Sequence, residues 1–108
     1  MKNISATIER IRELLADSQI EPLAEELNSY HSADLADILQ ELKEEERLDC
    51  FKLIDLDKAA EIIEYLSPQL QVELLGAIDE ERASQIITMM PHDAAADVLG
   101  DMEEDESE

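Results

Sequence analysis

The feature that most constrains the fold is a period of 24 residues that runs from His31 to Met102 without a gap. Each of the three 24-residue repeats divides into two 12-residue segments. The segments begin at His31, Lys43, Asp55, Ser67, Asp79 and Pro91. Three positions are apolar in every segment: the eighth (Ile38, Cys50, Ile62, Leu74, Ile86, Val98), the ninth (Leu39, Phe51, Ile63, Leu75, Ile87, Leu99) and the twelfth (Leu42, Ile54, Leu66, Ile78, Met90, Met102). A fixed period of this kind indicates a repeat architecture.

The spacing of the apolar positions predicts that each segment is a short helix. Residues eight, nine and twelve lie within about 100° of one another on a helix of 3.6 residues per turn, so they form one stripe. A strand would alternate with a period of two. Ser67, Asp55 and Asp79 can accept backbone N–H bonds at a helix start, and Pro68 and Pro91 suit a first turn.

Helices of about 8 to 10 residues are too short to be stable alone, so they must be held by stacking. Small residues at the fifth and sixth positions, such as Ala59 and Ala60, let neighbouring helices approach closely. We therefore predict an all-α fold, a right-handed superhelix of short helix-turn-helix repeats. Cys50, Phe51 and the apolar pairs at the eighth and ninth positions should form one elongated core.

The residues on either side of the repeats complete the predicted domain. Residues 1–30 should form two capping helices, which begin near Ser5 and Gln19 and belong to one domain with residues 31–102. The second of them, Gln19–Tyr30, is a diverged segment in which the eighth residue is Glu26 rather than an apolar one. Residues 103–108 are acidic and lack apolar side chains, so we expect them to be disordered.

The charge of the chain excludes some partners and favours others. Of the 108 residues, 29 are acidic and 8 are Lys or Arg, which gives a formal net charge of −21. Nucleic acids and anionic membranes are therefore unfavourable partners, whereas cations or a basic protein surface are favourable ones. No apolar run reaches the ~20 residues of a membrane span, so we expect a soluble chain that does not insert into a membrane.

The residue pattern gives no support to an enzyme. The single cysteine, Cys50, occupies a core position and is predicted to be a small buried hydrophobe. His31 and His92 are 61 residues apart and fall at helix starts, where they suit solvated or capping roles better than catalytic ones. The chain has no glycine-rich phosphate loop and no closely spaced His/Cys set for zinc.

Acidic residues recur on the face opposite the apolar stripe, at the third and seventh positions of the segments. Three segments are acidic at both positions, which gives the pairs Glu45/Asp49, Asp57/Glu61 and Asp93/Asp97. Like charges at this spacing destabilise a helix by ~0.2 to 0.5 kcal/mol per pair. A solvated face is one interpretation. The other is weak binding of Mg²⁺, which takes one or two carboxylates and keeps most of its water.

Several stretches also resemble a known family. The run HSADLADILQELKEEERLDCFKLI and its two successors closely resemble the cytoplasmic N-terminal domain of MgtE-type magnesium transporters, and the match covers roughly residues 20–102. Ser32 stands where that family usually has Pro. The resemblance implies a superhelix that is followed in the family by a pair of CBS domains and a membrane channel in a homodimeric transporter.

The resemblance also implies a mechanism and a set of site residues. Magnesium ions would bridge acidic residues of this domain and of the CBS domains when cytosolic magnesium is high, and so hold the channel closed. The positions that match are Glu61, Asp93 and Asp97, with Asp57, Glu45 and Asp49 as weaker candidates. We therefore expect a magnesium-sensing regulatory domain on the cytoplasmic side of the bacterial membrane, with weak surface sites.

A second interpretation needs no ion. Similar short-helix superhelices occur in a flagellar motor switch protein, where they pass conformational change between partners. By that resemblance the chain would be a protein-interaction scaffold without ion sensing.

Overall fold

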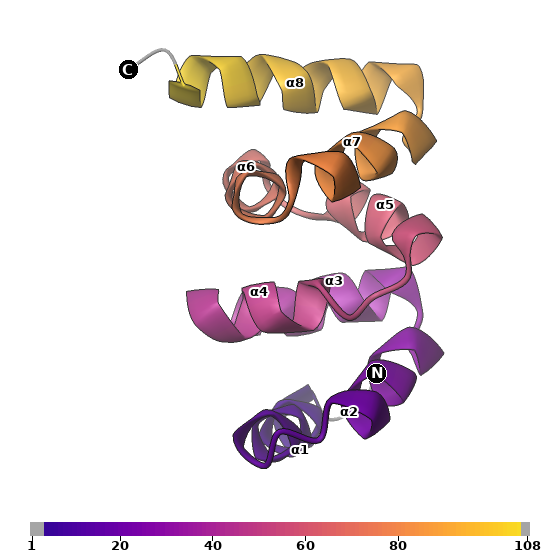
Figure 1. The fold of residues 1–108 in the computed structure, drawn as a ribbon, viewed down its shortest axis with the longest axis vertical. Coiled ribbons are helices and arrows are strands. Elements are labelled where there is room, and N and C mark those ends of the chain that lie inside the picture. The colour runs from indigo at the N-terminus through magenta and orange to yellow at the C-terminus, as the bar shows by residue number, and fades with distance from the viewer. Residues whose placement is uncertain (1–3, 107–108) are drawn as a thin grey trace. The chain divides into compact units, whose positions relative to one another are not determined.

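The fold is helical throughout the computed structural model, which describes residues 4–106 and the side chains of residues 4–102. Within residues 4–106 there are eight helices and no strand. In chain order they are α1 (Ile4–Ala16), α2 (Ile20–Ser29), α3 (Ser32–Glu41), α4 (Glu44–Phe51), α5 (Leu56–Tyr65), α6 (Pro68–Ala77), α7 (Glu80–Met89) and α8 (His92–Glu106) (Figure 1). The predicted all-α class is confirmed, and none of the described helices is long and apolar enough to cross a membrane.

Helices α2 to α8 each begin one residue after the predicted start. The first residue of each segment is therefore the N-cap, which precedes the first helical residue. Ser67 fills this role as predicted, since its Oγ accepts a hydrogen bond from the backbone N–H of Leu70 at 3.4 Å, and Pro68 is the first helical residue. The prediction that the Asp79 side chain also accepts a capping hydrogen bond is wrong, because that side chain makes none. Asp79 does precede α7 as predicted, and its negative charge suits the positive end of the helix dipole.

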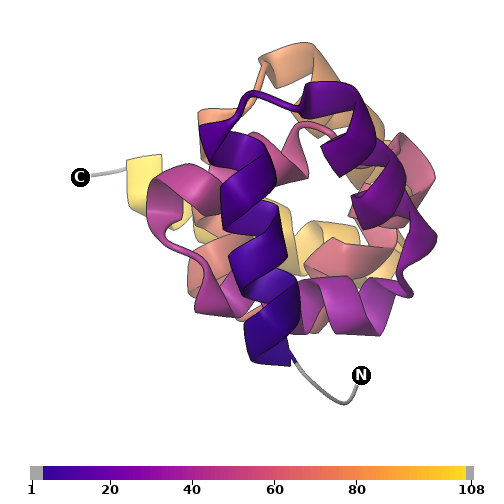
Figure 2. The same cartoon turned by 90° about the horizontal axis from the view of Figure 1, so that it is seen from below.

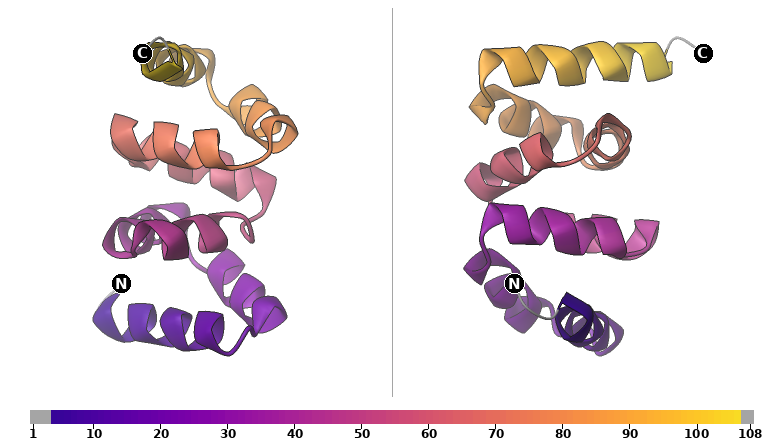
Figure 3. Two further views of the ribbon diagram at one scale, coloured as in Figure 1. Left: turned by 60° about the vertical axis from the view of Figure 1, so that its left-hand side comes forward. Right: turned by 180° about the vertical axis from the view of Figure 1, so that it is seen from behind.

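The chain divides into two compact units, Met1–Asp55 and Leu56–Glu108. In unit 1, α1 packs against α2 and α3, and α3 packs against α4 (Figure 2). In unit 2, α7 packs against α5 and α6, and α8 packs against α6 (Figure 3). Helices α5 and α6 of unit 2 are thus each packed against the helix two places later in the chain. The superhelix, its hand and a single elongated core stay predictions.

The predicted apolar stripe forms the interior of both units. The eighth residue is buried in all six segments. The ninth is buried in the first four, but Ile87 is only partly buried and Leu99 is 46% exposed. Each fully buried Ile, Leu or Phe side chain contributes about 1.5 to 3 kcal/mol relative to an exposed one. The stripe is therefore the main source of stability for helices this short.

The diverged second segment keeps a polar residue at its eighth position because a partner satisfies it. The Glu26 carboxylate accepts hydrogen bonds from Arg10 Nε of α1 and from the Tyr30 hydroxyl, the latter at 2.9 Å. Burial raises the pKa of Tyr30, and its bond to Glu26 raises it further. An ion pair thus joins α1 and α2 at the position that apolar residues occupy in the regular segments.

Two polar side chains, Arg47 and Gln71, bind backbone carbonyls at helix ends. The guanidinium of buried Arg47 donates to the carbonyl oxygens of Leu39 at 2.7 Å and Leu42 at 2.8 Å. Gln71, 24 residues later, donates to the carbonyl of Ile63 at 2.7 Å. The Arg47–Leu39 and Gln71–Ile63 bonds each span eight residues and reach the ninth position of the preceding segment. The 24-residue period therefore extends to side chain–backbone hydrogen bonds.

The end of the chain differs from the prediction of a disordered tail. Helix α8 continues through the acidic residues as far as Glu106, and residues 107 and 108 lie outside the described residues. Extending a helix that already exists costs far less than nucleating one, and Glu is a good helix former. Gly100 consequently lies well inside α8 and has no positive φ.

Candidate functional site

The first candidate pair, Asp57 and Glu61, lies on the outer face of α5. Both side chains are exposed, while Ala59, Ala60 and Ile62 of the same helix are buried. Residues four apart are neighbours on one face of a helix, so both carboxylates point to the same side. The 12-residue pattern correctly predicts this placement, because it puts the third and seventh positions opposite the apolar stripe.

The second pair, Asp93 and Asp97, lies on α8. Both side chains are exposed, and Val98 next to Asp97 is buried. Asp93 is in the first helical turn, where the helix dipole favours a negative charge. Asp97 is one turn further on and gains less from it. This pair therefore offers two solvent-facing carboxylates at the start of a helix in unit 2.

The third pair, Glu45 and Asp49, is exposed on α4 in unit 1. Its neighbour Glu46 is structural instead: the Glu46 carboxylate accepts the backbone N–H of Lys43 at 3.0 Å and binds Arg12 Nε at 3.0 Å. Burial opposes ionisation of Glu46, but the Lys43 and Arg12 bonds outweigh it and lower the pKa. Of the three acidic residues in the first turn of α4, Glu46 is thus committed to the fold.

The described residues contain no group of three or more His, Cys, Asp or Glu side chains placed to hold a metal ion. Each candidate pair therefore offers at most two protein ligands by itself. Mg²⁺ accepts such a set, because it binds through one or two carboxylates and fills its octahedron with water. The donors present fit a weakly bound, water-rich Mg²⁺ rather than a closed cage.

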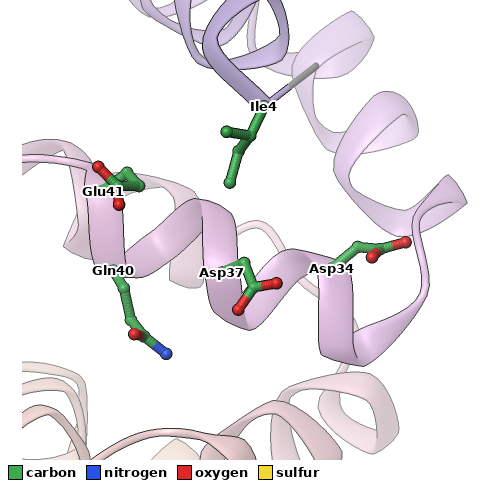
Figure 4. Close-up of a pocket in the computed structure, with 5 residues that line it drawn as sticks. All are labelled: Ile4, Asp34, Asp37, Gln40 and Glu41. Carbon is green, nitrogen blue, oxygen red and sulfur yellow. The ribbon is translucent and has the colours of Figure 1, made fainter. Parts of the chain in front are cut away.

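Unit 1 also contains an acidic cleft that was not predicted from the sequence. Asp34, Asp37 and Glu41 of α3 line it together with Ile4 and Gln40 (Figure 4). The spacing of three and then four residues places the carboxylates on one helix face, and that spacing was visible in the sequence. Figure 4 shows them spread along α3 rather than converging on one point.

Cys50 and the two histidines have the predicted environments. Cys50 is free and fully buried, and burial raises its pKa to about 12, so the thiol is protonated at neutral pH. A thiolate nucleophile requires the opposite shift. His31 precedes α3, and His92 begins α8, and both are exposed.

Comparison with known proteins gives one match. A family model described as the MgtE intracellular N domain matches residues 30–108. The match covers residues 30–55 of unit 1 and the whole of unit 2, and it includes all six candidate carboxylates. No curated protein and no solved structure matches the chain.

Proposed function

Because the chain belongs to the MgtE intracellular N domain family, we propose that it senses magnesium and regulates an MgtE-type transporter. The proposed mechanism is that Mg²⁺ joins exposed carboxylates of this domain to carboxylates of adjacent CBS domains. The bridges hold the channel closed while magnesium is plentiful. The family is not an enzyme family, and the role proposed for this domain is regulation.

One observation supports the proposal most: Asp93/Asp97 and Asp57/Glu61 are two exposed i, i+4 carboxylate pairs within one compact unit. An incomplete site suits a sensor, because an ion that one domain held tightly would stay bound at every concentration. Removal of the ion releases two negatively charged surfaces that then repel each other. The ion's charge is therefore the switch, and the rigid helices fix where the carboxylates lie.

Exposure alone does not select these pairs, because other i, i+4 acidic pairs are equally exposed. Glu21 and Glu25 of α2 form one such pair outside the repeats. Glu61, Asp93 and Asp97 are selected because they match acidic positions of the family, whereas Glu21 and Glu25 lie outside residues 30–108, which the family model matches. The Glu21/Glu25 pair therefore provides a matched control of equal charge and spacing.

The test is a magnesium titration of the 108-residue chain followed by backbone amide NMR at constant ionic strength. We expect fast-exchange shifts at 57–61 and 93–97, with no change in helical content. Asp93→Asn combined with Asp97→Asn should remove the response at 93–97. Glu21→Gln combined with Glu25→Gln should leave it unchanged. A response spread evenly over all acidic residues, and insensitive to the first double substitution, would reduce magnesium to a counterion.

A scaffold without ion sensing is the second candidate, and the partly exposed apolar residues Ile87 and Leu99 favour it. In a full-length transporter the two candidates differ clearly. Ion sensing predicts that the Asp93/Asp97 double substitution keeps the channel open at high magnesium, as measured by ²⁸Mg²⁺ or Ni²⁺ uptake into vesicles. A scaffold predicts no change in the magnesium dependence.

A further inference from the structure

The apolar stripe is left uncovered at one place in unit 2. Ile63 of α5 and Leu75 of α6 are 0% and 2% exposed, and α7 and α8 respectively pack against these two helices. The equivalent ninth residues of α7 and α8 are Ile87, which is partly exposed, and Leu99, which is 46% exposed. Within the described residues, no helix lies two places after α7 or α8.

These residues line a groove between α7 and α8, the last two helices in Figure 1. The groove is lined by the apolar residues Ala83 and Ile87 of α7 and Leu99 and Met102 of α8, together with the polar residues Glu80, Ser84 and Thr88. Its volume is about 360 Å³. Ile87 and Leu99 occupy the ninth position of their segments, Met102 the twelfth and Ala83 the fifth.

We propose that this groove binds an amphipathic helix of a partner protein that carries an apolar stripe flanked by basic residues. The repeat geometry specifies a helix, because everywhere else in unit 2 the ninth position is covered by one. Burial of Leu99 and Met102 against apolar side chains supplies the binding energy.

The charge of unit 2 specifies the flanks of that helix. Residues 56–108 contain fifteen acidic residues and only two basic ones, Lys58 and Arg82. A basic helix gains from this field, while an acidic one loses. A second copy of the chain would bring another net charge of −21 to the interface, so self-association is the disfavoured alternative. The groove is separate from the exposed carboxylate pairs that carry the proposed magnesium response.

The test uses a synthetic 14-residue Leu/Lys peptide with leucine at i, i+3, i+4 and i+7, and the full chain at 0.15 M salt. Binding is measured by fluorescence anisotropy, and its location by methyl NMR of Ile87, Leu99 and Met102. Two peptides serve as comparisons: a scrambled Leu/Lys peptide of the same charge and a Leu/Glu peptide with the original spacing. We expect the patterned basic peptide to bind at least ten times more tightly than either.

Two matched substitutions separate the groove from general apolar exposure. Leu99→Ser should weaken binding of the patterned peptide at least ten-fold, whereas Ile20→Ser, at a residue 48% exposed in unit 1, should not change it. Circular dichroism of both variants checks that the fold is retained. Equal binding of the scrambled peptide, or no effect of Leu99→Ser, would overturn the proposal. So would a dimer seen by sedimentation that Leu99→Ser dissociates, since the occupant would then be a second copy.

Discussion

At the scale of single residues, Arg47 shows what a periodic pattern leaves out. The pattern identifies the apolar positions, whereas the fifth position is small in several segments, such as Ala59, and is Arg47 in this one. The structure places the Arg47 guanidinium against two backbone carbonyls in the turn between α3 and α4. A cation at the end of a helix satisfies carbonyls that lack an intrahelical partner and interacts favourably with the dipole.

Replacement of Arg47 should therefore be costly. Arg47→Ala removes a buried charged donor and leaves the Leu42 carbonyl without this bond, so we expect a loss of about 2 to 3 kcal/mol in the free energy of unfolding. Urea denaturation monitored by circular dichroism measures it. The control is Arg12→Ala: the Arg12 side chain is 42% exposed and pairs with Glu46, and such exposed pairs contribute at most about 1 kcal/mol. Equal losses in the free energy of unfolding for the two variants would mean that the bonds from Arg47 to buried carbonyls contribute no more than an exposed ion pair.

The Asn28 side chain makes a second group of hydrogen bonds that the spacing of residues in the sequence does not reveal. Its amide donates to the carbonyls of Ala24 at 2.8 Å and Leu53 at 3.1 Å, and its Oδ1 accepts the backbone N–H of Asp55 at 2.9 Å. Residues 25 and 27 positions apart meet here because of tertiary packing. Local propensity and periodicity carry no information about such a contact.

At the scale of the elements, the sequence predicts the helices of the repeats almost completely. The starts of α2 to α8 differ from the predicted starts by only one residue each. The agreement is close because three apolar positions in twelve determine both where a helix lies and which of its faces is buried. The ends are predicted less well. Helix α8 extends to Glu106, since charge repulsion in an acidic run is smaller than the cost of breaking an existing helix at a place without Gly or Pro.

Gly76 gives a prediction at this scale. It is the last but one residue of α6, its φ is not positive, and a Cβ added there would meet no atom within 4 Å. Gly76→Ala should therefore stabilise the chain by about 0.4 to 1 kcal/mol, mainly because alanine restricts the unfolded chain. The neighbouring exposed Ala77 is the matched control, and Ala77→Gly should destabilise by a similar amount. Thermal unfolding at several protein concentrations would measure the stability of both variants. A lower melting temperature of Gly76→Ala than of the unsubstituted chain would contradict the prediction.

The candidate site was predicted only in part, for a physical reason. Helical phase determines that Asp57, Glu61, Asp93 and Asp97 face solvent, and the structure agrees. Which carboxylates share an ion depends on distances between helices and between proteins, and periodicity fixes neither. The cleft along α3 differs, because the spacing of Asp34, Asp37 and Glu41 is visible in the sequence, whereas the approach of Ile4 from α1 is a tertiary contact that the sequence does not show.

At the scale of the whole molecule, the net charge of −21 on 108 residues opposes compaction. The two compact units each carry part of this charge on exposed helix faces. Exposed charges are screened within about 10 Å at 0.1 M salt, so monovalent salt should raise the melting temperature. Each kcal/mol gained corresponds to roughly 4 to 8 °C for a domain of this size.

Magnesium provides the sharper form of that prediction. At matched ionic strength, MgCl₂ should raise the melting temperature above the value in NaCl, because an ion that binds the folded state stabilises it by mass action. Asp93→Asn combined with Asp97→Asn should reduce this excess. Glu21→Gln combined with Glu25→Gln, which removes the same charge at the same spacing, should not. An equal reduction of this excess by both double variants would show that magnesium acts on the total charge. Asp93 and Asp97 would then have no specific role in the proposed mechanism.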